Sequence, residues 1–296
     1  YGGVAAININ NVTVDLDDPA ILANATGGNG GEGRYGNPTF NAGDSGDGGN
    51  ATGGTARLQV TGAGGNIDLG FADIQSDAFG GQGFAGYRSF SGNGGSGGTG
   101  GDATGGRSEL VARTGGTINL TSGPFDFTSS GTGGAGGDGG YSYGFTPGDG
   151  GDGGSGTGGT ALFLAQGGTI TGQDVNVTVT GTGGNAGVGG TYFPGSGANG
   201  TTGTGGSGTG GTATIEVQEG SPGIVTFADV SINSSGTGGG GLIAGTGAGG
   251  RIEISDSSTD PAGLITLGSL TATAFDTAVG SAVGSDSAPL GGLFVT

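Results

Sequence analysis

The sequence predicts an all-β fold, a right-handed parallel β-helix (a solenoid) of about five coils, with long glycine-rich excursions stacked on one side. Two observations carry this prediction. Short phrases recur about every 52 residues, and the segments between the glycine-rich stretches alternate apolar and polar residues as strands do. A constant period of this length is typical of solenoids, propellers and other repeat arrays.

The period is clearest in the phrase that closes each glycine-rich stretch. ATGGTARLQV begins at residue 51, ATGGRSELVA at 103, GTGGTALFLA at 156 and GTGGTATIEV at 208. The shared threonine is Thr52, Thr104, Thr157 and Thr209, so successive copies are 52, 53 and 52 residues apart. We therefore expect one repeat domain over residues 1–296. Its approximate repeats are 1–50, 51–102, 103–155, 156–207, 208–244 and 245–296.

Each repeat contains about 24 residues that read as three short strands. In the first strand Leu58 and Val60 alternate with polar residues, and the apolar pair Ile67 and Leu69 follows a glycine-containing turn. Three strands that rise about 3.3 Å per residue form one triangular coil, and equivalent strands then stack in parallel about 4.8 Å apart. The usual crossover preference makes the coil right-handed.

Stacking in register predicts a ladder of buried side chains through the scaffold. Leu58, Leu110, Phe163 and Ile215 occupy the same place in successive repeats. Each fully buried apolar side chain of this kind contributes roughly 1.5–3 kcal/mol. We therefore expect these four residues to form part of the core.

The glycine-rich excursions share one plan, in which two glycine-rich arms flank an aromatic middle. Two alternatives are open for them. The arms form a slab of polyglycine II helices, because such helices have no internal hydrogen bonds and glycine allows close lateral approach; or they are mobile loops, because ordering glycine is entropically costly. The excursions span residues 26–54, 79–106, 131–159, 181–211 and 236–250.

Composition narrows the function classes. The 85 glycines are about four times the usual share of roughly 7%. With 24 acidic residues against six arginines, the net charge is −18, which disfavours nucleic acid and anionic membrane surfaces. No apolar run is long enough to cross a bilayer, so we expect no membrane insertion. Histidine, cysteine and lysine are absent, so only carboxylates and tyrosine are available for proton transfer. We therefore expect that the chain is not an enzyme.

Two sets of aspartates are candidate sites. Stacked carboxylates suit calcium, so the aspartates of the glycine-rich arms are candidate calcium ligands. Alternatively, they are ordinary turn residues that also keep the chain soluble. Because the GGxGG runs lack a following helix and a lysine, they do not predict a phosphate loop. A column of aspartates at one corner of the coil could accept hydrogen bonds from the backbone amides of the turn, or it could act as catalytic acids. The calcium candidates are Asp44, Asp47, Asp149 and Asp152, and the corner residues are Asp73, Asp126, Asp174 and Asp229.

Aromatic residues at the crests of the excursions are the main binding candidates. They either form exposed platforms for sugar rings or partner chains, or they make a small core that seals the far end of the slab. The pattern leaves both open. The residues are Tyr35, Phe40, Tyr87, Phe90, Tyr143, Phe145, Tyr192 and Phe193.

The strand phrases GGTINLTSG, GGTITGQDVNVTVTGTGG and GLITLGSLTATAFDT, with GGLFVT, resemble the strand repeats of filamentous-haemagglutinin-like exoproteins, which are large bacterial surface adhesins. The resemblance covers the rhythm of residues 51–296. It implies a β-helical shaft at the cell surface, outside the cell. The glycine-rich excursions depart from that pattern and are similar to the polyglycine sandwich of some phage adhesins.

We therefore expect a non-enzymatic, extracellular structural or adhesive segment whose crests contact a surface glycan, a protein receptor or identical subunits, without a cofactor. A self-assembling filament or surface-layer subunit that stacks through its coil ends is the main alternative, because uncapped β-edges pair with other chains. A phage tail-fibre tip is a lesser one. An acidic β-helix enzyme is the least favoured reading.

Overall fold

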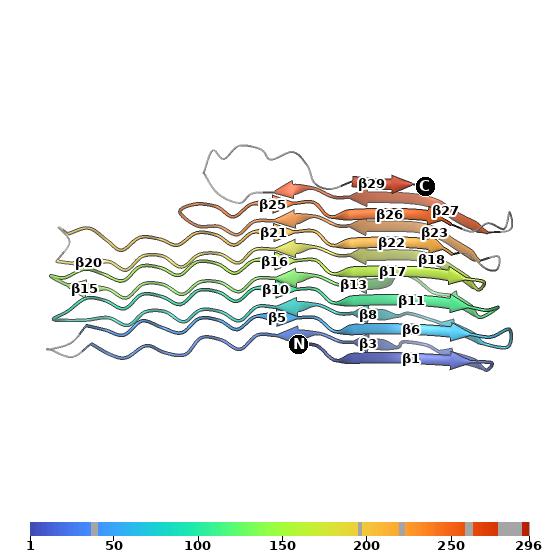
Figure 1. Ribbon diagram of the computed structural model, residues 1–296, viewed down its shortest axis with the longest axis horizontal. Coiled ribbons are helices and arrows are strands. Elements are labelled where there is room, and N and C mark those ends of the chain that lie inside the picture. The colour runs from blue at the N-terminus through green and yellow to red at the C-terminus, as the bar shows by residue number, and fades with distance from the viewer. Residues whose placement is uncertain (37–40, 195–196, 219–222, 258–262, 278–291, 296) are drawn as a thin grey trace.

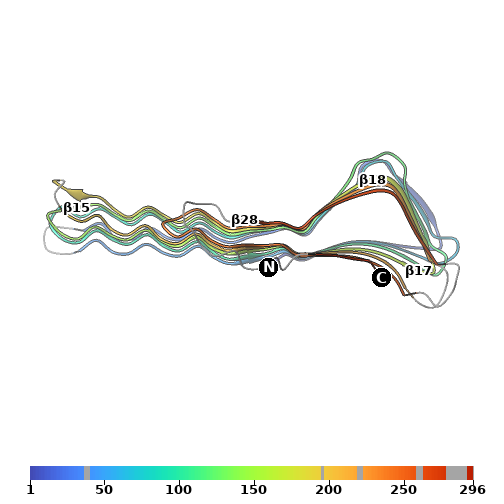
Figure 2. The same cartoon turned by 90° about the horizontal axis from the view of Figure 1, so that it is seen from above.

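The computed structural model describes residues 1–36, 41–194, 197–218, 223–257, 263–277 and 292–295. The part of the chain that it describes contains β-strands and no helix, and thus no helix that could cross a membrane. The repeats stack in parallel, and each one contributes strands to a scaffold and a pair of extended arms to a flat slab beside it (Figure 1). Seen from above, the slab has two layers that meet the scaffold at a narrow neck (Figure 2).

Two large parallel sheets enclose the scaffold core. The first is β1 (Val4–Asn10), β6 (Thr55–Thr61), β11 (Arg107–Arg113), β17 (Thr160–Gln166), β22 (Thr212–Val217), β26 (Arg251–Asp256) and β29 (Gly292–Val295), in that order. The second contains β2 (Thr13–Leu16), β3 (Ala20–Leu22), β7 (Asn66–Leu69), β8 (Asp73–Gln75), β12 (Thr117–Leu120), β13 (Phe125–Thr128), β18 (Thr169–Thr178), β23 (Ile224–Asn233) and β27 (Leu264–Thr273).

Two sheets of two-residue strands form the neck, one in each layer. Where the chain leaves the scaffold, these are β4 (Ala25–Thr26), β9 (Ala78–Phe79), β14 (Gly131–Thr132), β19 (Gly181–Thr182), β24 (Gly236–Thr237) and β28 (Asp276–Thr277). Where it returns, they are β5 (Ala51–Thr52), β10 (Ala103–Thr104), β16 (Gly156–Thr157), β21 (Gly208–Thr209) and β25 (Gly247–Ala248).

The predicted ladder of buried side chains is confirmed. Leu110 pairs with Leu58 on one side and Phe163 on the other, and Phe163 pairs with Ile215. All four are at most 1% exposed and belong to one continuous apolar core. The alternation along the first strand of each repeat therefore reports which side chains face inward.

The strands of the second sheet are interrupted in the first three repeats and continuous in the later ones. In the first three repeats a break separates its two short strands, whereas β18, β23 and β27 run unbroken for ten residues. The register pairs Leu120 with Gly172 and Phe125 with Val175, so the third repeat carries two more residues at this corner than the fourth. One of the residues at the break is Pro124, which has no amide hydrogen to donate to a sheet ladder. The expectation of three separate strands in every repeat is therefore wrong for the later repeats.

Backbone hydrogen bonds join the arms into layers. In a glycine pair, the first amide donates to the next repeat in the same layer, as from Gly80 N to Thr132 O (2.9 Å). The second amide donates to the other layer, as from Gly81 N to Gly49 O (2.8 Å). The pattern recurs every three residues along the described arms, so these arms are hydrogen-bonded layers rather than separate loops.

Glycine is required in the interior of the slab because a side chain there would overlap a neighbouring backbone. A Cβ atom on Gly134 would lie 1.9 Å from the carbonyl oxygen of Gly81, and one on Gly137 would lie 2.0 Å from that of Phe84. Gly28, which holds the same place in the first repeat as Gly134 in the third, has nothing within 4 Å of such an atom. The third residue of each triplet points outward and can carry a side chain.

Candidate functional site

The turns of the excursions gather aromatic side chains at the end of the slab far from the scaffold. The short strand β15 (Ser142–Tyr143) pairs with β20 (Tyr192–Phe193) and sets Tyr143 beside Phe193. The rings of Phe90, Tyr143 and Phe193 stack in a row, with centroids 5.2 and 5.4 Å apart and planes tilted by 26° and 24°. These three residues are 42–50% exposed, so each ring packs against a neighbour and still leaves part of its surface open to solvent.

A second row lies beside the first and contains a cation. Arg88 sits between Tyr35 and Tyr141, its Nε donating to the hydroxyl of Tyr35 and its Nη1 to that of Tyr141 (2.6 Å). The guanidinium carbon is 5.4 Å and 5.7 Å from the centroids of these two rings, within the range of a cation–π contact. The hydrogen bonds that Arg88 donates to Tyr141 and Tyr35 raise the pKa of Arg88, so the group stays charged.

The second row borders a shallow hollow. It has a volume of about 350 Å³ and is lined by Tyr35, Phe84, Tyr87, Arg88 and Tyr141, among others. The hydroxyl of Tyr87 donates to the Glu32 carboxylate (2.9 Å), and this bond raises the pKa of the phenol. We call the two rows and this hollow the aromatic edge; its members are Tyr35, Phe84, Tyr87, Arg88, Phe90, Tyr141, Tyr143 and Phe193.

The aromatic candidates do not all meet in one place. Phe145 (47% exposed) and Tyr192 line a separate hollow with Asn93, and Phe40 lies outside the described residues. Arg88 and Tyr141 are not among the predicted aromatic candidates. The repeat period does indicate them, because Tyr35, Arg88 and Tyr141 follow one another at intervals of 53 residues.

The four calcium candidates each accept hydrogen bonds from the next repeat. Asp47 Oδ1 accepts from Thr99 N, and Asp44 and Asp152 make the same contact with Ser96 and Thr204, at 2.6–2.8 Å. Asp149 accepts from both the amide and the hydroxyl of Thr201, each at 2.7 Å.

These bonds, the amide bond above all, lower the pKa of the Asp149 carboxyl. Within the described ranges no three acidic side chains gather as metal ligands would. Asparagine makes the same contact at other outward positions; for example, Asn50 Oδ1 accepts a hydrogen bond from Asp102 N (2.8 Å). These aspartate and asparagine side chains hold neighbouring arms in register.

The four corner aspartates do not form one column, so that prediction is wrong. Asp126 pairs with Asp73 on one side but with Asn176 on the other, and Asp174 pairs with Asp229. The offset arises because Asp73 lies four residues after Leu69, whereas Asp174 lies only two residues after Gly172, which holds the same ladder position as Leu69. Burial raises the pKa of Asp73, with smaller contributions from Asp126 and other acids, while a hydrogen bond from Gln75 opposes the shift.

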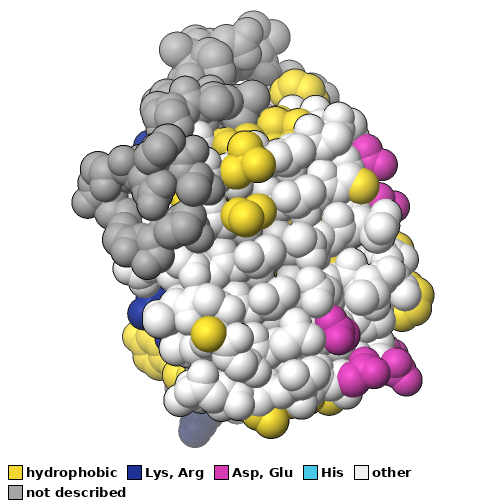
Figure 3. All heavy atoms as spheres, turned by 90° about the vertical axis from the view of Figure 1, so that its right-hand side faces the viewer, with side chains coloured by type: hydrophobic (Ala, Val, Ile, Leu, Met, Phe, Trp, Pro, Cys, Tyr) yellow, Lys and Arg dark blue, Asp and Glu magenta, His cyan; other side chains and the backbone are white. Residues whose placement is uncertain are grey.

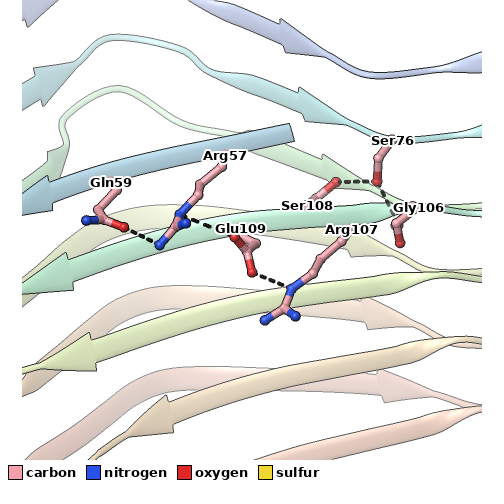
Figure 4. Close-up of polar contacts among 8 residues, drawn as sticks. Arg57, Gln59, Ser76, Gly106, Arg107, Ser108 and Glu109 are labelled. Atoms are coloured by element: carbon pink, nitrogen blue, oxygen red, sulfur yellow. Dashed lines mark hydrogen bonds and ion pairs between the residues drawn. The ribbon is translucent and has the colours of Figure 1, made fainter. Parts of the chain in front are cut away.

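The outer face of the first sheet carries an ion-pair group at its middle (Figure 4). Glu109 is 7% exposed and lies between two arginines, 3.3 Å from Arg57 Nε and in direct contact with Arg107. Behind it, the buried hydroxyls of Ser76 and Ser108 are 3.1 Å apart (Figure 4). Since each carboxylate and hydroxyl is paired with a neighbouring group, this cluster stabilises the scaffold.

Figure 3 shows the opposite end of the molecule, the end of the scaffold away from the arms. Acidic side chains lie along one side of this face, and hydrophobic side chains are visible elsewhere on it.

Comparisons with known proteins give little guidance. No protein-family model matches the chain, and no curated protein matches it. Among solved structures, it is similar to a springtail antifreeze protein from Granisotoma rainieri, described as a bundle of nine polyproline type II helices. The two are 19% identical over 80% of this chain and 95% of that chain, with a TM-score of 0.15, which is too low to carry an argument about fold or function.

Proposed function

We propose that the chain is a non-enzymatic, extracellular segment of a bacterial surface protein, with a structural or adhesive role. Its scaffold is a right-handed parallel β-helix of about five coils. Its excursions form a slab of polyglycine II arms, consistent with the three-residue hydrogen-bond period and with arms that bond only laterally. The scaffold holds the slab rigid and presents the aromatic edge for contact with a surface glycan, a protein receptor or another subunit.

The observation that carries this proposal is the exposure of the aromatic edge. Phe90, Tyr143 and Phe193 remain 50%, 42% and 44% exposed although they stack on one another. A row of half-exposed rings on a rigid backbone loses little conformational freedom when it binds, and such amphipathic side chains are enriched at interfaces. Contact through this edge leaves the buried core of the scaffold untouched.

A glycan array read with the purified chain tests the proposal. The double variant Phe90→Ser/Tyr143→Ser removes two of the three rings of the stacked row, and Phe71→Ser, on a scaffold residue that is 49% exposed, is the control. We expect the wild type and the control to bind a class of glycan that the double variant no longer binds. If the double variant keeps every class of glycan that the wild type binds, adhesion does not lie at the aromatic edge.

Self-assembly into a filament or surface layer is the second candidate. β1 lies at the edge of the first sheet, and Ala5 and Ile7 are only partly buried, whereas their partners Ala56 and Leu58 are completely buried. A further repeat stacked on this edge would bury them. Electron microscopy at rising protein concentration distinguishes the two candidates, because persistent monomers contradict assembly. A trimer in solution would instead favour a phage tail-fibre tip.

A further inference from the structure

A groove runs along the neck, in the layer where the chain leaves the scaffold. It has a volume of about 610 Å³ and is lined by equivalent residues of five successive repeats. One rim is the second residue of each short strand, and the register sets these residues side by side. We call it the neck groove. Its first rim is Thr26, Phe79, Thr132, Thr182 and Thr237.

The second rim lies three residues further along each arm and carries amides. Asn29, Gln82 and Asn185 hold this position in the first, second and fourth repeats, and glycines form the floor between the rims. Three residues of a polyglycine II helix span about 9 Å. The groove is therefore a trough about 9 Å wide whose two rims repeat at the strand spacing of about 4.8 Å.

The amides of this rim have a fixed orientation. Asn29 Oδ1 accepts from Gln82 N (3.1 Å), and Asn185 Oδ1 accepts from Gly240 N (2.8 Å). With the oxygen held by the neighbouring arm, each NH₂ group points away from that bond. Neither NH₂ group, nor the hydroxyl of Thr132 or Thr182, bonds to another of the described residues. Side-chain NH₂ groups and threonine hydroxyls that are free to bind a ligand therefore recur along the groove from one arm to the next.

The groove is neutral although the chain is strongly acidic. None of its lining residues is charged, against a net charge of −18 for the chain. The returning layer carries carboxylates at its outward positions, including Asp47, Asp102 and Asp152. A cationic ligand would favour that layer, and an anionic one is repelled by the whole chain. The neck groove is suited to an uncharged ligand with many hydroxyl groups, for which Phe79, 46% exposed, adds an apolar contact.

We propose that the neck groove binds a neutral, linear, β-linked polysaccharide that lies along the stack with one sugar ring per repeat. The ligand must offer equivalent groups at about the strand spacing of 4.8 Å, and the rings of extended β-linked glycans repeat at close to that spacing. An extended peptide advances about 3.3 Å per residue and does not present the same group to every repeat. This site is separate from the aromatic edge and does not depend on it.

Calorimetric titration with defined oligosaccharides tests the proposal. Cellohexaose and chitohexaose are the β-linked neutral probes, maltohexaose is the α-linked control, and oligogalacturonate is the acidic control. We expect at least one β-linked probe to bind, with affinity that grows as the oligosaccharide is lengthened from three to five sugars, and we expect both controls to bind at least tenfold more weakly. A wild-type protein that binds neither β-linked probe, or binds maltohexaose equally well, overturns the proposal.

A matched pair of variants locates the site. Asn185→Asp keeps the oxygen that accepts from Gly240 N but replaces the outward donor with negative charge; Ser207→Asp adds the same charge in the same repeat on the opposite layer. We expect Asn185→Asp to weaken binding about tenfold or more and Ser207→Asp to leave it unchanged. Thr182→Val, which removes one groove hydroxyl, should weaken binding several-fold.

Hydrogen exchange of the arms and the melting temperature establish that each variant is folded. Unchanged affinity in both groove variants, or equal loss in Ser207→Asp, contradicts the assignment. So does loss of binding in Phe90→Ser/Tyr143→Ser, because that result would place the glycan on the aromatic edge.

Discussion

Replacing one interior glycine of the slab by alanine tests whether the arms pack as closely as the structure shows. In Gly134→Ala the new methyl group would lie 1.9 Å from Gly81 O and 2.6 Å from its carbonyl carbon. Both are backbone atoms, so no side chain can rotate away and the arms must separate. Separation stretches the bonds from Gly134 N to Gly101 O and from Gly154 N to Gly134 O, both 2.8 Å.

The expected cost follows from these contacts. Overpacking typically costs about 1–3 kcal/mol, and each weakened hydrogen bond adds about 0.5–1.5 kcal/mol. Alanine has less conformational entropy than glycine in the unfolded chain, and this difference offsets about 0.4–1 kcal/mol of the loss in folding free energy. With two weakened bonds, we therefore expect Gly134→Ala to lose about 1–6 kcal/mol. Gly28→Ala is the control, since its methyl group meets nothing within 4 Å and should leave stability unchanged or raise it slightly.

Scanning calorimetry and hydrogen exchange measure the two effects. A domain of this size loses about 2–4 °C of melting temperature per kcal/mol, so Gly134→Ala should melt several degrees below the wild type. Its amides in residues 94–101 and 133–140 should exchange faster, while those of the scaffold change little. Equal melting temperatures and equal exchange in Gly134→Ala and Gly28→Ala would refute the close packing of the arms.

Three further predictions concern the scaffold and the contacts between arms. Leu110→Asp places a charge among fully buried side chains and should cost more than about 4 kcal/mol, whereas Thr214→Asp, half-buried on the polar face of the same sheet, should cost far less; calorimetry compares them. Glu109→Gln should cost about 1–2 kcal/mol, discounted because the Arg57 and Arg107 side chains are 30% and 51% exposed, and urea titrations should show the difference shrinking with salt. The lowered pKa of Asp149 means that its carboxylate stabilises the fold fully above the ordinary aspartate pKa of 3.8 and progressively less as the pH falls through the lower pKa of the folded state. The wild type should therefore exceed Asp149→Asn in melting temperature at pH 6 and lose that advantage below pH 3.8; a constant difference would contradict this account.

The sequence is most informative where one residue has one neighbour in every repeat. The alternation around Leu58 and Leu110 predicts the inward ladder because a strand has a period of two and the stack repeats it. The same reasoning does not predict how the corner aspartates pair. Asp73 lies four residues after Leu69, whereas Asp174 lies only two residues after Gly172, which holds the same ladder position, so the two aspartates fall in different columns. The longer loop before Asp126, which keeps that residue beside Asp73, hides this shift in the sequence period, because register depends on loop length as well as on strand residues.

The candidate sites show the same limit. Asp47 and Asp149 looked like spare metal ligands because their partners, Thr99 and Thr201, are 52 residues away in the sequence. Tyr141 and Arg88 do not stand out within their own excursions, because the Tyr35–Arg88–Tyr141 row takes one residue from each of three excursions. In a stacked repeat, the partner of a surface side chain lies one period away.

This rule also explains how so much glycine can be ordered. Each residue of an arm costs about 1–2 kcal/mol of backbone entropy, more for glycine, and gives no buried apolar side chain in return. The compensation comes from lateral bonds, two backbone bonds per triplet and a third from an outward Asp or Asn such as Asp102, whose Oδ1 accepts from Ser155 N (2.7 Å). All three need neighbouring arms at a fixed spacing. The apolar core of the scaffold sets that spacing, so the slab and the surfaces it carries should remain ordered only as long as the scaffold is folded.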